Sequence, residues 1–209
     1  MEAMTETLRR KYSPRRSREE RREQLLDAAL QVIDTGGFGA FTIEAVAREA
    51  GLAKTVVYAT FENQEELLRS LIAREQQRAF WAITGVFPKP PFGDDPLDVL
   101  ERGLMAVLQV VHQHPETWRL ILLPPEGAPP AIRASVDQHR AGLKTSLDPV
   151  VAWGLAQIGH GHLDPDLAAH MLIAACEEGI RLTLADPERY TPERLTEFAA
   201  SLITTFLQG

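Results

Sequence analysis

The sequence has little of what cross-links a small secreted fold or anchors a chain in a membrane. Its 209 residues include one cysteine, Cys176, so no internal disulfide is available and the chain suits a reducing compartment. No apolar run reaches the ~18 residues that a membrane span requires. No apolar stretch follows the basic residues near the start, as it would in a signal peptide. We therefore expect a cytoplasmic protein without membrane contact.

Signals for β-strands are nearly absent as well. There is no sustained alternation of apolar and polar residues, and no Asn-Gly or Asp-Gly pair marks a hairpin. Apolar residues recur instead at the three- and four-residue spacings of amphipathic helices. The sequence therefore predicts an all-α fold of roughly nine helices.

Glycine, proline and capping residues place the ends of these helices. Gly36 and Gly37 should end the first, Thr42 should cap a short second helix, and Asn63 should begin a long helix reaching about Val86. Pro149 is expected to kink or interrupt a later helix. The other expected helices are a short one after Gly51, then Leu97 to Pro115, one through Trp118 and Leu122, Pro130 to about Ile158, 165–185 and 192–207.

Charge is distributed unevenly along the chain. The formal net charge is −7, yet residues 8–22 hold eight basic and two acidic side chains, whereas residues 61–209 hold 12 basic and 20 acidic ones. A basic arm on an acidic body points to a polyanionic partner at one end. The alternative is a solvated tail.

The stretch 41–61 has the pattern of two short helices that cross steeply. Ala47 supplies a small residue for the crossing, and Gly51, four positions later, supplies a turn residue that tolerates positive φ. The second helix would expose Lys54, Thr55 and Tyr58, a polar face suited to base edges and phosphates in the major groove. The alternative is a helical corner without DNA binding. The apolar positions left for a small core are Val46, Leu52, Val57 and Phe61.

Residues 22–72 resemble the N-terminal domain of TetR-type transcriptional regulators. The resemblance is carried by Ala28–Leu30, Gly37, Phe38, Thr42, Ile43, Val46, Ala47, Ala50, Gly51, Val57, Tyr58, Phe61 and Glu65–Leu68. It implies a helix-turn-helix reader of a palindromic operator and a divergent ligand domain. It also implies a repressor, with an activator or a ligand-independent regulator as the alternative.

The resemblance assigns roles to individual positions. Thr42 would cap its helix and bind a phosphate, Lys54 and Thr55 would touch base edges, and Tyr58 would contact the DNA backbone. Thr60 stands where a histidine is usual and Gln64 where a lysine is common, so two customary backbone contacts are altered. An arginine-rich arm can compensate by reaching phosphates or a minor groove. Its predicted contact residues are Arg15, Arg16 and Arg18.

Large apolar side chains in the second domain suggest a pocket for a small, uncharged or weakly polar hydrophobic effector. Most of these side chains could simply form core. His139 and Arg140 could supply polar contacts. The candidate pocket residues are Phe80, Trp81, Met105, Trp118, His139, Arg140 and Trp153.

The last two helices carry small and apolar residues that permit close approach to a second copy, since such readers span two half-sites as dimers. Burial within one chain is the alternative. The predicted homodimer interface comprises Leu172, Ala175, Cys176, Gly179, Leu195, Phe198, Leu202 and Phe206. We therefore divide the chain into a basic flexible arm (1–19), a helix-turn-helix DNA-binding domain (20–65) and a helical effector-binding and dimerisation domain (66–209).

Signals for catalysis or metal binding are weak. The pairs His112/His114 and His160/His162 lie two residues apart, a spacing that does not share a helix face. Cys176 lies among alanines and is expected to pack as a small hydrophobe. We expect no cofactor and no metal. A small helical enzyme stays the alternative from another class.

Overall fold

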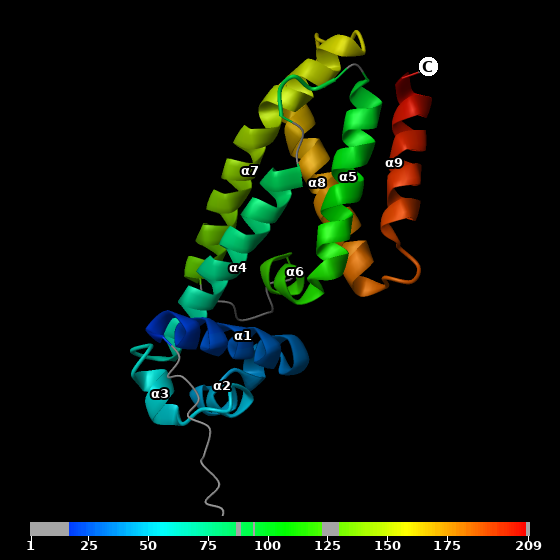
Figure 1. Ribbon diagram of the computed structural model, residues 1–209. Coiled ribbons are helices and arrows are strands. Elements are labelled where there is room, and N and C mark those ends of the chain that lie inside the picture. The colour runs from blue at the N-terminus through cyan, green and yellow to red at the C-terminus, as the bar shows by residue number, and fades with distance from the viewer. Residues whose placement is uncertain (1–16, 87–88, 94, 123–129, 208–209) are drawn as a thin grey trace, which may run out of the picture.

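The structure is a computed structural model that describes residues 17–86, 89–93, 95–122 and 130–207, with side chains in these ranges except at 130–139 and 206–207. Within them the chain is helical and forms no strand, which confirms the all-α prediction (Figure 1). The elements are α1 (Arg18–Gly36), the short 3₁₀ helix η1 (Phe38–Ala40), α2 (Ile43–Glu49), α3 (Lys54–Tyr58), α4 (Gln64–Val86), α5 (Pro96–Gln113), α6 (Pro115–Leu122), α7 (Pro130–Gln157), α8 (Pro165–Ala185) and α9 (Pro192–Leu207).

The predicted caps explain where the first helices begin. The Thr42 hydroxyl accepts a hydrogen bond from the Ala45 N–H (3.1 Å), and the Asn63 side-chain oxygen Oδ1 accepts one from the Glu66 N–H (2.9 Å). Ser17 and Glu20 form a reciprocal capping box that starts α1 at Arg18. Each cap satisfies N–H groups that have no partner within the helix.

The helices form two groups joined by α4 (Figure 1). At one end α1, α2 and α3 surround a core that includes Leu25, Val46, Val57 and Phe61, each at most 1% exposed. At the other end α7 packs on α4 and α8, while α5 packs on α8 and α9. Because α4 contributes Leu67 and Leu71 to the first core and Ala79 and Ile83 to the second, the two groups share one rigid element.

Pro149 lies inside α7, which continues without a break to Gln157. The helix is therefore not interrupted at Pro149, and a kink stays the predicted effect of this proline. Beside it Lys144 donates to Asp148 (2.9 Å) on α7 and pairs with Asp166 (2.6 Å) on α8. No helix within the described ranges combines the length and apolarity that crossing a bilayer demands.

Candidate functional site

The turn between α2 and α3 fixes the angle of the recognition helix. Gly51 has φ +65°, a left-handed conformation that a side chain would oppose. The Gly51 N–H donates to the Arg48 carbonyl (3.1 Å), and the Leu52 N–H donates to the Ala47 carbonyl (2.9 Å). This pair of bonds ends α2 in a Schellman turn. The predicted role of Gly51 is confirmed.

The predicted base-contacting face of α3 is solvent exposed. Tyr58 is 56% exposed, and Lys54 and Thr55 are exposed beside it. The Lys54 ammonium donates to the carboxylate of Glu44, an exposed residue in the first turn of α2. This hydrogen bond, more than any other interaction, lowers the pKa of Glu44 below its ordinary value. The contact places one cation and one anion together on the face that would meet DNA.

Three predicted phosphate-contacting side chains also bond to the protein itself. The Thr42 hydroxyl accepts at its helix cap and keeps its own hydrogen for an acceptor such as a phosphate oxygen. The Thr60 hydroxyl donates to the Val56 carbonyl (2.9 Å), so its proton must leave that bond before it can reach DNA. The Gln64 amide donates to the Phe41 carbonyl (2.8 Å), which ties the start of α4 to the chain just before α2.

The basic arm is described only at its junction with α1. Arg18, the first residue of α1, is exposed. Arg15 and Arg16 lie outside the described residues, as does most of the predicted arm.

A first cavity, of about 100 Å³, opens among α4, α6, α7 and α8. Trp118, which is 3% exposed, contributes to its wall from α6. Arg140 and Glu177 supply its charged groups and form an ion pair of 2.9 Å. Its other lining residues include Ala79, Phe80, Ile83, Val107, Leu143, Leu147, Ile173, Cys176 and Ile180.

A second cavity, of about 290 Å³, lies among α5, α7, α8 and α9. Its described lining is apolar and includes Trp153, whose indole lies 5.2 Å from the Phe92 ring between centroids, with the two ring planes tilted by 44°. The cavities share three lining residues, Val107, Leu147 and Cys176. Burial, and then the Glu177 carboxylate, raise the pKa of the Cys176 thiol to about 11, so the shared wall is uncharged at neutral pH.

The structure divides the predicted pocket residues. Phe80, Trp118 and Arg140 line the first cavity and Trp153 lines the second. Met105 lines neither cavity. Trp81 is 65% exposed on α4 and lines neither cavity. Its size and apolar character were therefore not enough to place it in a pocket. His139 lies outside the residues whose side chains are described.

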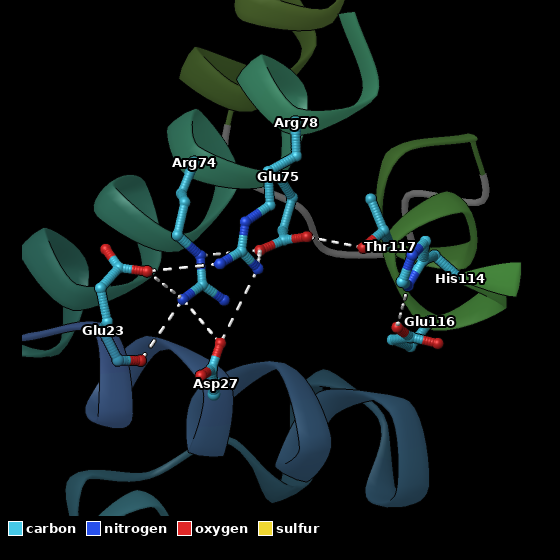
Figure 2. Close-up of polar contacts among 8 residues, drawn as sticks. All are labelled: Glu23, Asp27, Arg74, Glu75, Arg78, His114, Glu116 and Thr117. Carbon is cyan, nitrogen blue, oxygen red and sulfur yellow. Dashed lines mark hydrogen bonds and ion pairs between the residues drawn. The ribbon is translucent and has the colours of Figure 1, made fainter. Parts of the chain in front are cut away.

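A buried polar network joins the two groups of helices (Figure 2). Glu75 of α4 is fully buried and accepts hydrogen bonds from the Thr117 hydroxyl of α6 (2.6 Å) and from Arg74 Nε (2.8 Å). Arg74 also pairs with Glu23 (3.0 Å) and Asp27 (2.8 Å) of α1. The three helices α1, α4 and α6 are therefore bonded together through two adjacent residues.

Helix α6 has a second link to α1. Arg119 Nη1 lies 2.9 Å from Asp34 Oδ1. The opposite side of α6 presents Trp118 and Ile121 to the first cavity. The short helix α6 thus contacts both the first cavity and α1, the helix on which α2 of the helix-turn-helix packs.

The exposed faces of α8 and α9 carry an apolar patch. Leu167 and Met171 on α8 and Phe198 and Leu202 on α9 are 44–72% exposed. We call these four residues, with the exposed Ala175, the α8–α9 patch.

The other predicted interface residues lie elsewhere. Leu172 lines the second cavity and Cys176 lines both. A Cβ at Gly179 would lie 3.9 Å from Leu108, and Leu195 packs on the same core. These four positions face the interior because they lie on the side of each helix that meets α5. The side chain of Phe206 lies outside those described.

No group of three or more metal-binding side chains comes together within the described part of the chain. The rings of His160 and His162 lie 5.6 Å apart in the turn before α8.

Sequence reasoning missed the buried network and the ion pair of Lys54. A signal for the first was available: Glu75 continues the four-residue spacing of Leu67 and Leu71, so a carboxylate stands in an apolar stripe of α4. No comparable signal marks Glu44, because its pairing depends on how α2 crosses α3.

Comparisons with known proteins extend these observations. The family described as bacterial regulatory proteins, tetR family, matches residues 25–71. The transcriptional repressor KstR of Rhodococcus jostii is 32% identical over 99 residues, which cover 47% of this chain and 44% of KstR. The chain thus aligns with less than half the length of that relative.

Solved structures match over more of the chain. A TetR-like regulator from a Rhodococcus species is 26% identical with a TM-score of 0.73, covering 93% of this chain and 100% of that one. The Bacillus subtilis regulator FadR, solved with stearoyl-CoA, is 20% identical with a TM-score of 0.68, covering 86% of this chain and 96% of FadR. The latter similarity establishes a shared fold.

The matched segment 25–71 contains the Gly51 turn and the exposed face of α3, and the fold likeness extends over the helices that line the two cavities. Residues 25–71 therefore match the DNA-binding domain of the tetR family of bacterial regulatory proteins, and the fold of the described chain is similar to that of a TetR-like transcriptional regulator.

Proposed function

We propose that this protein is a dimeric repressor that acts in the cytoplasm and leaves a palindromic operator when an apolar effector enters the first cavity. The position of α6 carries this proposal. Trp118 contributes to the cavity wall, while the neighbouring Thr117 and Arg119 hold α4 and α1. A ligand that displaces Trp118 would move the helix on which the reader depends.

The energetics of release require a ligand that distinguishes two conformations. A preference of about 3 kcal/mol for the non-DNA conformation lowers operator affinity more than a hundredfold. Operator DNA must then weaken ligand binding by the same factor. Closely packed cavity walls favour this behaviour, because packed cores respond to a ligand by moving between discrete arrangements.

The proposed DNA contacts divide into two kinds. Lys54 and Thr55 would read base edges, whereas Tyr58, Thr42 and the arm would bind the backbone. Because the side chains of Thr60 and Gln64 donate hydrogen bonds to backbone carbonyls of the protein, these two residues should contribute less to DNA affinity. The α8–α9 patch would bury its apolar side chains against a second copy, setting the separation of two readers.

The ligand would be an apolar body with one polar end. Sequence reasoning favoured an uncharged or weakly polar molecule, but the Arg140–Glu177 pair on the first cavity favours a charged end. The stearoyl-CoA in the related FadR structure supports an acyl chain as the apolar body.

An operator selected from a random duplex pool with the full chain tests the reader. Lys54→Ala should change which bases are preferred, and Tyr58→Phe should weaken all duplexes alike. Affinity should also fall with salt by roughly one log-log unit per phosphate contact. An unchanged base preference in Lys54→Ala would contradict the assignment of α3.

Calorimetric titration of apolar candidates, with and without the selected duplex, tests release. We expect binding to weaken on DNA and the duplex to dissociate. A regulator that ignores every apolar compound, or responds to metal ions or nucleotides alone, would contradict the proposed effector class.

A further inference from the structure

The two cavities adjoin each other across a thin wall. Val107, Leu147 and Cys176 each line both, so a single layer of side chains separates them. Ligand sites usually enclose about 300–1,000 Å³. The first cavity falls short of that range, and the two together enter it.

Two of the three side chains in this wall are of types that can change rotamer without a change in the backbone. Leu147 and the Cys176 thiol are unbranched at Cβ and can exchange rotamers, whereas Val107 is fixed at χ1. Because Leu147 and Cys176 come from α7 and α8, a rotation of either side chain would join the cavities between these helices. The opening would be narrow, which suits an unbranched chain better than a bulky ring system.

The joined space is polar at one end only. Among its described lining residues, Arg140 and Glu177 are the charged ones, and both belong to the first cavity. The Glu177 carboxylate pairs with two arginines, because Arg181 lies 3.6 Å from it in addition to Arg140. If an anionic ligand takes Arg140, Glu177 retains Arg181 as a counterion.

We propose that the two cavities form one site for a single unbranched aliphatic chain with an anionic head. The head binds Arg140, and the tail passes between Leu147 and Cys176 to end beside Trp153. This inference rests on the proposed function, since it names the chemical class of the effector.

Gly103 of α5 offers a way to shorten the site from its far end. Gly103 is buried, lines the second cavity and does not line the first. Outside its own helix and chain neighbours, a Cβ built there would meet no atom within 4 Å. Gly103→Leu should therefore fill the second cavity without clashing with another helix, and Gly103→Ala is the matched control.

Binding of octanoate, dodecanoate and octadecanoate to the full chain tests the length of the site. In the wild type, affinity should rise by about fourfold for each methylene buried. Gly103→Leu should lower octadecanoate affinity by about a hundredfold and change octanoate by less than about threefold. Gly103→Ala should keep the wild-type order. Equal weakening of all three chains would overturn the shared site.

Arg140→Gln tests the head, with Arg102→Gln as control because Arg102 is an exposed arginine that pairs with Asp98 and lines neither cavity. Arg140→Gln should weaken octadecanoate by about tenfold to a hundredfold and leave octadecanol nearly unchanged. Octadecanoyl-CoA, included as a second source of the same chain, should keep its dependence on Gly103. Equal effects of Arg140→Gln on the acid and the alcohol would overturn the proposed head position.

Tryptophan quenching tests the path of the chain independently of affinity. In a Trp81→Phe background, Trp118→Phe leaves Trp153 as reporter and Trp153→Phe leaves Trp118. A fatty acid brominated near its methyl end should quench Trp153, and one brominated near its carboxylate should quench Trp118. Failure of the methyl-end acid to quench Trp153, or of the carboxylate-end acid to quench Trp118, would overturn the proposed path.

Operator release is measured separately with the selected duplex. If chains bind as described but DNA is retained, the chain site stands and the proposed function fails. If another apolar compound releases DNA and no aliphatic chain binds, the proposed function stands and this inference fails.

Discussion

On the exposed face of α2 and α3, Lys54 forms an ion pair with Glu44 in addition to its proposed contact with DNA. The Lys54 ammonium lowers the pKa of Glu44, so the pair favours the folded state above the ordinary carboxyl pKa. That contribution is lost as the pH falls through the lowered, folded-state pKa of Glu44. Both groups are exposed, so salt should weaken the pair.

Removal of Lys54 should therefore raise the pKa of Glu44 toward its ordinary value. Carboxyl titration by NMR on the wild type and Lys54→Ala measures this change. Arg69→Ala serves as control, because Arg69 is exposed on α4 and lies 4.0 Å from Glu65 instead. An identical Glu44 titration in wild type and Lys54→Ala would show that the pair does not form in solution.

The Thr117 hydroxyl of α6 donates a hydrogen bond to the buried carboxylate of Glu75 on α4. Thr117→Val keeps the shape and removes a hydrogen bond to a buried charged group, so unfolding free energy should fall by about 1.5–3 kcal/mol. Urea denaturation measures the loss. Thr117→Ser should retain most of the stability, and Thr145→Val, at an exposed hydroxyl that bonds within α7, should change it little. An unchanged free energy of unfolding in Thr117→Val would mean that this hydrogen bond contributes no net stability.

At the scale of the helix, two glycines with opposite backbone requirements give a matched pair. Gly103 lies inside α5 with open space at its Cβ, so Gly103→Ala should stabilise the fold by about 1 kcal/mol. Gly51 has φ +65°, so Gly51→Ala should destabilise it by about 1–2 kcal/mol. Thermal unfolding distinguishes them. Changes of the same sign would show that the conformation assigned to one of the two is wrong.

At the scale of the whole molecule, dimerisation would follow from the α8–α9 patch. Leu202→Asp would bury an unpaired charge at a second copy's surface, which costs several kcal/mol. Light scattering should report monomers for Leu202→Asp, with much weaker operator binding. Trp81→Asp, at an apolar residue on α4 that is more exposed than Leu202, should remain dimeric. A stable Leu202→Asp dimer would place the interface elsewhere.

Local sequence rules predicted the reader almost completely. Thr42 and Asn63 cap their helices, and Gly51 adopts positive φ, because each requirement is met within a few residues along the chain. The apolar core of Val46, Val57 and Phe61 likewise follows from spacing alone. The sequence therefore determined where most helices begin and end, although α7 continues past Pro149 to Gln157 instead of stopping there.

The tertiary structure decided which face of each helix does what. Trp81 and Trp118 are equally plausible as pocket residues by composition, yet one is 65% exposed and the other 3%. Leu172 and Leu202 are similar by spacing, yet one lines a cavity and the other is exposed. Helical periodicity defines a stripe of residues but not the partner that covers it, since the partner depends on contacts between segments far apart in sequence. The sequence by itself thus determined the fold class and the two helices α2 and α3 with their turn. The packing of the helices determined the cavities, the Glu75 network and the α8–α9 patch.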